Sequence, residues 1–375
     1  MQFEWTKKYK VLAILLIVGG VFFAGLSLNY IQWLKNALIS STESYKTELS
    51  RLERENIKLE DLTKAQELDI IVNREYITNG VSVDYIFQIS PSDLSLNNFI
   101  VEEKDNTEAI RLIITGHPYG SPSNQGSITP SSTLVDAVDE INQREPDLFF
   151  TLGDLAYAPS EESFDELDER FLSKVDAPIF NAPGNHDFYN GREFYEEKFG
   201  QSFYYFKYGQ IQVIILDTEV GHCAILGRQR EMLEQAITSA LDDNKISSVF
   251  IFFHKTLFLE KKPELISQVN GPCEYGRNYS ELESDLFISA AQEKPLYLIA
   301  GDVGASGGNL SPFYYKYPDI NLYTLAVGLG DSPNDVLLQV DILPSSDIEL
   351  ELIAIGGNEF SRIETYTPAY WTPSE

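Results

Sequence analysis

The residues that could do chemistry in this sequence stand directly after short apolar runs. Three of the four histidines do so, at positions 117, 186 and 254, and carboxylates stand in the same way at Asp154 and Asp302. Imidazole and carboxylate groups are the usual ligands of divalent metal ions in proteins, and they are also the usual general acids and bases. The pattern therefore indicates a metal-binding or acid–base site.

The apolar runs predict how these residues come together. From Ile110 onward, strand-like runs alternate with helical patterns, which is typical of layered α/β architecture. The polar groups follow the runs at residues 115–117, 153–154, 184–187, 254 and 301–302. Because ligands of α/β folds bind beyond the carboxyl ends of the strands, we expect the five endings to converge.

Short motifs at these positions carry a family resemblance. They are GDLAY at residues 153–157, GNHD at 184–187, the isolated His254, and a Gly-Asp pair at 301–302. In this order they resemble the calcineurin-like metallophosphoesterase family, whose pattern is D-x-H, GD, GNH followed by D or E, H, and GHxH. A tyrosine three residues after the Asp of GD is more particular to the purple acid phosphatase branch. The resemblance implies an α/β fold, an α/β/β/α sandwich of two mixed sheets, over residues 108–355.

The resemblance also implies a site with two metal ions. Asp154 would bridge the ions, and Asn185 and His254 would bind the second one. Tyr157 would bind iron at the first position if the purple acid phosphatase branch applies. Two such cations activate water and stabilise both the attacking and the leaving oxygen of a phosphoester. The implied activity is metal-dependent hydrolysis of a phosphoester substrate.

Two further residues of the GNHD motif receive catalytic roles from the same resemblance. His186, held by Asp187, would protonate the leaving oxygen or stabilise charge on the phosphoryl group. The protein would then need only to position and polarise the reacting groups.

The sequence departs from the family pattern at the first and last motifs. Thr115 stands where the first motif has aspartate, and Asp302 and Gly304 stand where GHxH has its histidines. The first metal position is therefore left with Asp154 and His117, and with Tyr157 in the purple branch. We expect this position to be weak or empty.

The second metal position keeps a usable set of ligands. It has Asp154, Asn185 and His254 and gains Asp302 as an oxygen ligand. Three oxygen donors and one nitrogen favour manganese, magnesium, calcium or iron over zinc. One firmly bound divalent metal is the expected cofactor.

Each of these residues also has a plainer interpretation. His254 could be a buried histidine of the core, Asp154 a turn or helix-cap residue, and Asp302 a turn residue beside the Gly-rich run that follows it. His117 precedes a proline and could be a loop residue, and Tyr157 could belong to the core or the rim. The losses at residues 115 and 304 leave open a second function, that of a catalytically silent scaffold or binding module.

The composition limits the partners. The chain of 375 residues has 57 acidic and 28 basic side chains, and its formal net charge is −29. Because such a charge repels polyanions, nucleic acid is not an expected partner.

An uncharged segment near the N-terminus predicts a membrane anchor. Residues 11–28 carry no charge, and roughly 18 residues at about 1.5 Å each nearly match a hydrocarbon core of about 30 Å. The lysines at 7, 8 and 10 place residues 1–10 in the cytoplasm, with 11–30 as a signal anchor in the lipid bilayer and the rest outside the cytoplasm. A cleaved signal peptide and a buried core helix are the alternatives.

The next segments connect the anchor to the domain. Residues 31–72 read as a helical stalk whose apolar positions recur every seven residues, which predicts a short coiled coil and a homodimer formed through residues 38–66. A single exposed helix would fit as well. Residues 73–107 are assigned to a linker or small extension, and residues 356–375 to a C-terminal tail.

The chain contains two cysteines, Cys223 and Cys273. Export would place both in an oxidising space, so we predict that they form a disulfide bond. Two unpaired buried cysteines are the alternative.

Overall fold

The computed structural model describes residues 87–120, 129–273, 278–305 and 310–372. The predicted anchor at residues 11–28, the stalk at 31–72 and the dimerising segment at 38–66 lie outside these ranges. Within them, no helix is both long enough and apolar enough to cross a membrane.

One sheet has five strands in the order β11-β10-β1-β2-β3. The strands are β1 (Ile110–Thr115), β2 (Leu148–Thr151), β3 (Ile179–Asn181), β10 (Val336–Ile342) and β11 (Ile348–Ala354). β1, β2 and β3 are parallel, whereas β10 is antiparallel to both of its neighbours. The three parallel strands end at the same edge, where the first three polar groups follow them.

The second sheet has six strands in the order β4-β5-β6-β7-β9-β8. The strands are β4 (Tyr204–Tyr208), β5 (Ile211–Ile215), β6 (Ser248–Phe253), β7 (Leu296–Ala300), β8 (Phe313–Lys316) and β9 (Leu322–Ala326). β5, β6, β7 and β9 are parallel to one another, and β4 and β8 are antiparallel strands at the two edges. Both sheets are therefore mixed.

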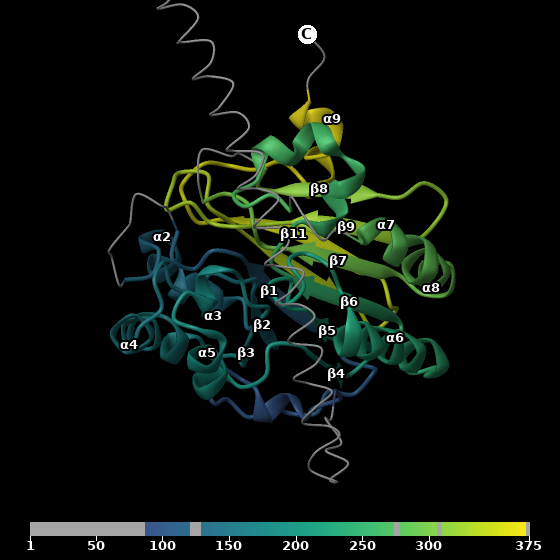
Figure 1. The fold of residues 1–375 in the computed structure, drawn as a ribbon. Helices are drawn as coiled ribbons and strands as arrows, with labels where there is room; N and C mark the ends of the chain where they lie inside the picture. The colour runs from purple at the N-terminus through teal and green to yellow at the C-terminus, as the bar shows by residue number, and fades with distance from the viewer. Residues whose placement is uncertain (1–86, 121–128, 274–277, 306–309, 373–375) are drawn as a thin grey trace, which may run out of the picture. The chain divides into compact units, whose positions relative to one another are not determined.

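Helices cover the outer face of each sheet (Figure 1). The five-stranded sheet is covered by α2 (Ser132–Asp136), α3 (Val138–Gln143), α4 (Glu161–Arg170) and α5 (Arg192–Phe199). The six-stranded sheet is covered by α6 (Gly227–Asp242), α7 (Tyr279–Leu282) and α8 (Ile288–Glu293), with the π-helical η7 (Glu283–Phe287) between the last two. A short α9 (Pro368–Trp371) lies near the end of the chain.

Short 3-10 helices connect several of these elements. They are η1 (Pro91–Asp93), η3 (Leu172–Lys174), η4 (His186–Phe188), η5 (Leu257–Lys261), η6 (Pro263–Gln268) and η8 (Ile363–Thr365). Of these, η4 contains part of the GNHD motif.

Strand β6 shows why the apolar runs form central strands. All six of its residues are buried, and from Val249 to Phe253 the run is apolar throughout rather than alternating. Val249, Ile251 and Phe253 pack against the outer helices, and Phe250 and Phe252 point between the two sheets. There, the ring of Phe252 stacks on Phe150 of the opposite sheet with 4.2 Å between the ring centroids. The core thus consists of three apolar layers, one between the sheets and one under each set of helices.

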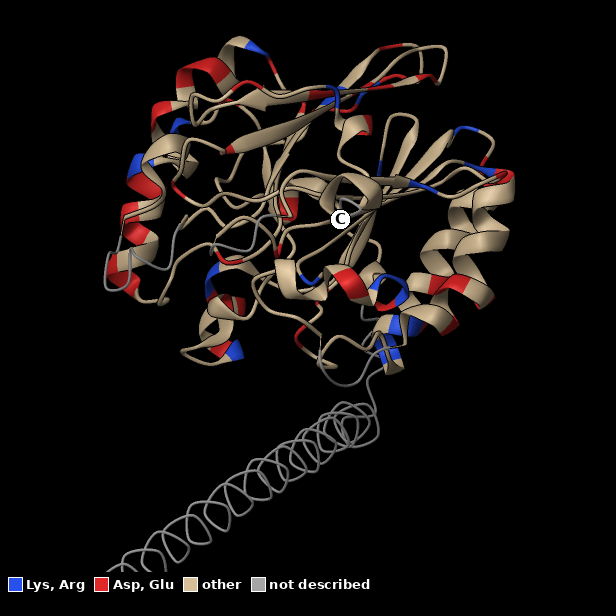
Figure 2. Ribbon diagram, turned by 90° about the horizontal axis from the view of Figure 1, so that it is seen from above, with Lys and Arg blue, Asp and Glu red and all other residues tan. Residues whose placement is uncertain are grey.

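The charged residues lie mostly on the outer helices and at the ends of strands (Figure 2). Helix α4, with the sequence EESFDELDER, buries Phe164 and Leu167 and exposes its acidic face. Its first turn is closed by a capping box between Ser160 and Ser163. The predicted α/β fold with two mixed sheets is therefore confirmed.

Two segments assigned to a linker and a tail pack against the domain. Near its start, Ile89 and Tyr205 join residues 87–89 to β4 by backbone hydrogen bonds, and the side chain of Asn97 donates to carbonyls near β3. Near its end, Ile363 is 1 % exposed and belongs to the layer between the sheets. The described part of each segment is thus structurally part of the domain.

The structure contains the predicted disulfide bond. Cys223, in the loop between β5 and α6, is bonded to Cys273, which follows η6. The bond connects two surface segments that are 50 residues apart in the sequence.

Candidate metal centre

Strand pairing brings the polar residues together. Phe253 of β6 pairs with Ala300 of β7, so His254 and Gly301 leave the sheet side by side. The N–H groups of Gly301 and Asp302 both donate to the His254 carbonyl, at 3.0 and 2.8 Å. On the opposite sheet, Thr115 pairs with Thr151, which places the turns after β1 and β2 next to each other.

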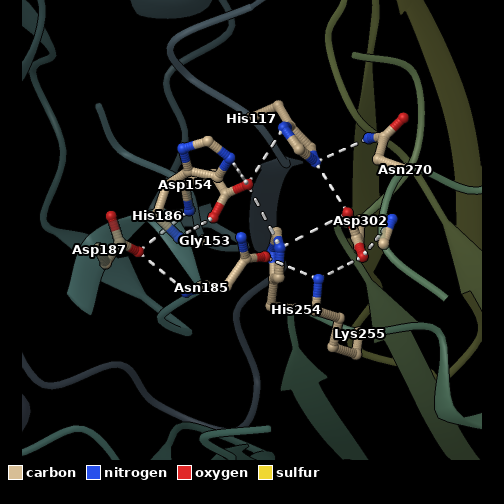
Figure 3. A network of polar contacts seen from close by, with 12 residues as sticks. His117, Gly153, Asp154, Asn185, His186, Asp187, His254, Lys255, Asn270 and Asp302 are labelled. Atoms are coloured by element: carbon tan, nitrogen blue, oxygen red, sulfur yellow. Dashed lines mark hydrogen bonds and ion pairs between the residues drawn. The ribbon is translucent and has the colours of Figure 1, made fainter. Parts of the chain in front are cut away.

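Four side chains from these turns form a compact buried cluster (Figure 3). His117, Asp154, His254 and Asp302 each offer one ligand atom, and these atoms lie within 4.8 Å of one another. Asp154 Oδ2 lies 3.5 Å from both His117 Nδ1 and His254 Nε2, and Asp302 Oδ1 lies 3.3 Å from His117 Nε2 and 3.6 Å from His254 Nε2. None of the four side chains is more than 1 % exposed. Two histidines and two carboxylates thus face one another out of water.

The protonation of His254 shows what the cluster requires. Its Nδ1 lies 2.7 Å from the carbonyl oxygen of Leu152, and because a carbonyl can only accept, Nδ1 carries the hydrogen. Burial lowers the pKa of His254 well below its ordinary value, so the ring is neutral and Nε2 presents a lone pair. Among the described residues this buried lone pair has no hydrogen-bond partner, and it points toward two carboxylate oxygens. A buried lone pair that faces two carboxyl groups fits a bound cation between them.

The two carboxylates have opposite electrostatic surroundings. Burial, together with the charges of Asp187 and Asp302, raises the pKa of Asp154 to about 7, although His117 and Lys255 act against the rise. Burial would also raise the pKa of Asp302, but Lys255, His254 and His117 outweigh it and hold that pKa well below its usual range. Asp302 is therefore the firmly ionised member of the cluster.

Lys255 is not among the residues that the motifs predict, yet it lies at the edge of the cluster. Its Nζ donates to Asn185 Oδ1 at 2.7 Å and to Asp302 Oδ2 at 2.8 Å. Burial opposes the charged form of this ammonium, but Asp302, Glu219 and Asp154 outweigh it and raise the pKa of Lys255 above its ordinary value. The only sequence signal is its place directly after His254 in an otherwise buried run.

Asn185 takes part in the site through this lysine. Its Oδ1 accepts from Lys255, and its Nδ2 donates to the hydroxyl of Tyr189 at 3.0 Å. His117, in contrast, stands within the cluster, and Asn270 Nδ2 lies 2.9 Å from its Nε2. Among the histidines and carboxylates of the described residues, the geometry thus groups two nitrogens with two oxygens. The role of Asn185 as a further oxygen ligand stays a prediction.

His186 approaches the cluster from its more exposed side. Its side chain is 14 % exposed, and its Nε2 lies 4.0 Å from Asp154 Oδ2. The other ring nitrogen, Nδ1, lies 2.6 Å from the carbonyl oxygen of Tyr157, and burial lowers the pKa of His186. Tyr157 also packs its ring against His186, at 4.9 Å between centroids. The sequence assigns the orientation of His186 to Asp187, and the structure gives this role to the carbonyl of Tyr157.

Asp187 instead holds the backbone of the two neighbouring turns. Its carboxylate accepts the N–H groups of Asp154, Leu155 and Gly184, at distances between 2.8 and 3.0 Å. Burial raises the pKa of Asp187 to about 6, although these donors lower it. The residue therefore acts on Asp154 through the main chain.

Two glycines permit the close approach of these turns. Gly153 has φ of +87°, and a Cβ there would collide with the ring of His254 and the backbone of Gly184. A Cβ on Gly184 would collide with the Asp154 carboxylate and with the same ring. Asp154 itself has φ of +61° and His117 +54°, a conformation that is uncommon outside glycine and typical of functional sites.

The residues that depart from the family pattern fit their surroundings. Thr115 is fully buried, and its hydroxyl donates to the carbonyl of Gly116. Gly304 has φ of +92°, and a Cβ there would collide with the carbonyl of Gly328. Because any side chain at residue 304 is excluded by this backbone, the last histidine of the pattern has no place here.

Comparison with known proteins identifies a family that part of the chain resembles. The model of the calcineurin-like phosphoesterase family matches residues 130–255. The resemblance predicted from the motifs is confirmed. The match includes Asp154, the GNHD motif and His254, whereas His117 and Asp302 lie outside it. A search of curated proteins found no match.

Several solved structures resemble the chain. A purple acid phosphatase from yellow lupin is 14 % identical with a TM-score of 0.47, covering 69 % of this chain and 54 % of its own. A dimetal phosphatase from Danio rerio is 13 % identical with a TM-score of 0.46, covering 66 % and 96 %. A phosphopantetheinyl hydrolase from Mycobacterium tuberculosis is 12 % identical with a TM-score of 0.33, covering 60 % and 91 %. The chain thus spans about half the length of the lupin protein.

Proposed function

We propose that this domain hydrolyses phosphoesters with one firmly bound divalent metal ion. The observation that carries the proposal is the buried convergence of the His254 Nε2 lone pair with the carboxylates of Asp154 and Asp302. His117 completes the set of four ligands. Desolvated acceptors that face one another are costly, and a cation bound between them would remove this cost.

In the proposed reaction, metal binding and proton transfer fall to different residues of this chain. His117, Asp154, His254 and Asp302 hold the ion, which when bound would activate water and draw charge from the phosphoryl oxygens. His186 stands at the exposed side with Nε2 turned toward Asp154, so it is the group that can exchange a proton with the leaving oxygen. The carbonyl of Tyr157 fixes the orientation of its ring.

We propose manganese as the metal. The preference for harder cations such as calcium and magnesium rests on an oxygen from Asn185, and this oxygen accepts a hydrogen bond from Lys255. Two imidazoles and two carboxylates suit manganese, iron or zinc better than calcium. Comparison of binding by Mn²⁺, Mg²⁺, Ca²⁺ and Zn²⁺ at one pH tests this choice.

The function is tested by metal titration beside hydrolysis of generic phosphate mono- and diesters. Asp154→Asn keeps the acceptor for the His186 N–H but removes the charge, so it should lower Mn²⁺ affinity about a hundredfold or more and abolish hydrolysis. Asp165→Asn makes the same change at a side chain that is 75 % exposed, and it should alter neither the Mn²⁺ affinity nor the rate of hydrolysis. Absence of metal binding by the wild-type protein would overturn the proposal.

The alternative is a catalytically silent scaffold, and one observation favours it. All four cluster side chains are essentially buried, which limits the access of a substrate to them. Tight binding of one Mn²⁺ without hydrolysis of either ester class would support this alternative.

We further propose that the domain lies outside the cytoplasm, held by the anchor at residues 11–28, and that residues 38–66 pair two chains. The disulfide between Cys223 and Cys273 supports an oxidising compartment. A reporter fused after the C-terminus should be active only outside the cytoplasm, and the chain should stay in the membrane fraction after alkaline washing. Release of a shortened soluble form would indicate a cleaved signal peptide instead.

A further inference from the structure

The ammonium group of Lys255 is built into the site rather than placed at its surface. The residue is 7 % exposed, and its Nζ contacts one oxygen of Asn185 and one of Asp302 at hydrogen-bond distances (Figure 3). Gly271 lies against this pair, and a Cβ at that position would collide with Nζ and approach Asp302 Oδ2 to 2.9 Å. The N–H of Gly271 also donates to Asp302 Oδ2 at 3.1 Å.

Asp302 uses its two oxygens for two different cations. Oδ1 faces the histidines of the cluster, and Oδ2 accepts from Lys255 and Gly271. Asn185 and Asp302 are also two of the four residues that the motif pattern assigns to the second metal position. Three of these four residues also hold the proposed ion. The ammonium therefore occupies the two oxygens of the set, Asn185 Oδ1 and Asp302 Oδ2, that this ion would leave for a second one.

A second observation concerns the balance of charge. The carboxylates of Asp154, Asp187 and Asp302 are buried within the same few turns. Desolvated carboxylates are costly unless a cation compensates them. One divalent ion among the four ligands leaves part of this negative charge for Lys255 to neutralise.

From these observations we infer that Lys255 replaces the second metal ion of the site and supplies its positive charge as part of the polypeptide. The inference deepens the proposed function and rests on it, because the second charge matters for hydrolysis only if the first cation binds. Two of the three N–H donors of the ammonium contact Asn185 and Asp302, and among the described residues the third remains for a phosphoryl oxygen. In this arrangement Lys255 is a catalytic residue that binds the phosphate group.

The decisive variant is Lys255→Met, which keeps the length of the side chain and removes its charge. Without the ammonium, Asn185 and Asp302 Oδ2 become available as ligands, so the variant should bind two Mn²⁺ ions where the wild-type protein binds one. Calorimetry would count the ions. Electron paramagnetic resonance would show an isolated Mn²⁺ in the wild type and an exchange-coupled pair in the variant, since ions in such sites lie about 3.5–4 Å apart.

A matched control removes a lysine charge elsewhere. Lys207 pairs with Asp243 at 2.8 Å on the surface, and Lys207→Met should leave both the stoichiometry and the spectrum unchanged. Two coupled ions in the wild-type protein, or a single ion in Lys255→Met, would overturn the inference. The ion count and the spectrum do not depend on turnover, so they separate the inference from the proposed function. If the wild-type protein hydrolysed no ester but Lys255→Met still bound two ions where the wild type binds one, the proposed function would be contradicted. The replacement of a metal ion by Lys255 would then still hold.

A second variant covers the case in which Lys255→Met does not fold. If the oxygen of Asn185 binds the ammonium rather than a metal ion, Asn185→Ala should change Mn²⁺ affinity by less than about threefold. A loss of more than about tenfold would mean that the ion displaces Lys255 from Asn185, and it would contradict the inference.

Discussion

The two sides of the candidate metal centre are held in place by different means. On the side of the five-stranded sheet, His117 and Asp154 stand in turns with positive φ. The N–H groups of Asp154 and Leu155 donate to the carboxylate of Asp187, and the N–H of His117 donates to the carbonyl of Gly153. On the side of the six-stranded sheet, His254 and Asp302 follow directly from paired strands, and the Lys255 ammonium binds Asp302.

Because of this difference, the two sides should respond differently to mutation. The first side depends on backbone hydrogen bonds to one buried acceptor, so its geometry should be lost when that acceptor is removed. The second side depends on strand register and on an ion pair, so it should keep its backbone geometry and respond mainly to changes of charge. Variants of the side chains that surround the candidate metal centre should therefore differ between the two sides in whether they affect stability or metal binding.

The largest effect is expected from Asp187→Ala on the first side. It leaves three buried N–H groups without their acceptor, and each costs about 1–3 kcal/mol, so we expect a loss of roughly 3–6 kcal/mol in the free energy of unfolding. Urea denaturation of the metal-free protein measures this loss of stability. Asp187→Asn, which keeps one acceptor oxygen, should lose clearly less. A loss below about 1 kcal/mol would show that the turns are held by other contacts.

An intermediate effect is expected from the disulfide on the second side. Replacing both Cys223 and Cys273 by serine removes the constraint on a 50-residue loop, which should lower stability by about 2–4 kcal/mol. Reduction of the wild-type protein serves as the control and should give the same loss in denaturant titrations. If the double variant were as stable as the wild type, the second side would owe its stability to strand pairing alone.

The smallest effect is expected from a variant that should change metal affinity but not the stability of the fold. Asn270 Nδ2 lies 2.9 Å from His117 Nε2, so Asn270→Ala should lower Mn²⁺ affinity about fivefold and leave unfolding unchanged within about 0.5 kcal/mol. Calorimetry measures the Mn²⁺ affinity, and urea denaturation measures the free energy of unfolding. Asn106→Ala removes an exposed side-chain hydrogen bond to Lys245 and should change neither. If Asn270→Ala lowered the free energy of unfolding as much as Asp187→Ala does, the two sides would not differ in the way proposed.

Much of the fold and part of the site could be predicted from the sequence. The fully apolar runs such as residues 249–253 indicate buried parallel strands, and the residues that follow them converge at the strand ends as expected. His117, Asp154, His254 and Asp302 are brought together, although their role as metal ligands stays a prediction.

The remaining contacts depend on features without a sequence signature. Lys255 adjoins His254 in the chain, but its role follows from contacts with Asn185, which is 70 residues away, and with Asp302, which is 47 residues away. Asp187 acts through backbone N–H groups, which every residue type presents. A lysine within a buried run is nevertheless a usable signal, because a lysine is almost never buried without a partner.

The attachment of Lys255 to the chain also determines how the site responds to its surroundings. A metal ion is held by mass action, so its occupancy falls on dilution or when a chelator competes for it. A side-chain ammonium has no dissociation equilibrium, and loading of the site therefore depends on the first power of the metal concentration rather than on the second. Where divalent cations are scarce, a protein of this kind reaches its fully charged state by capturing a single ion.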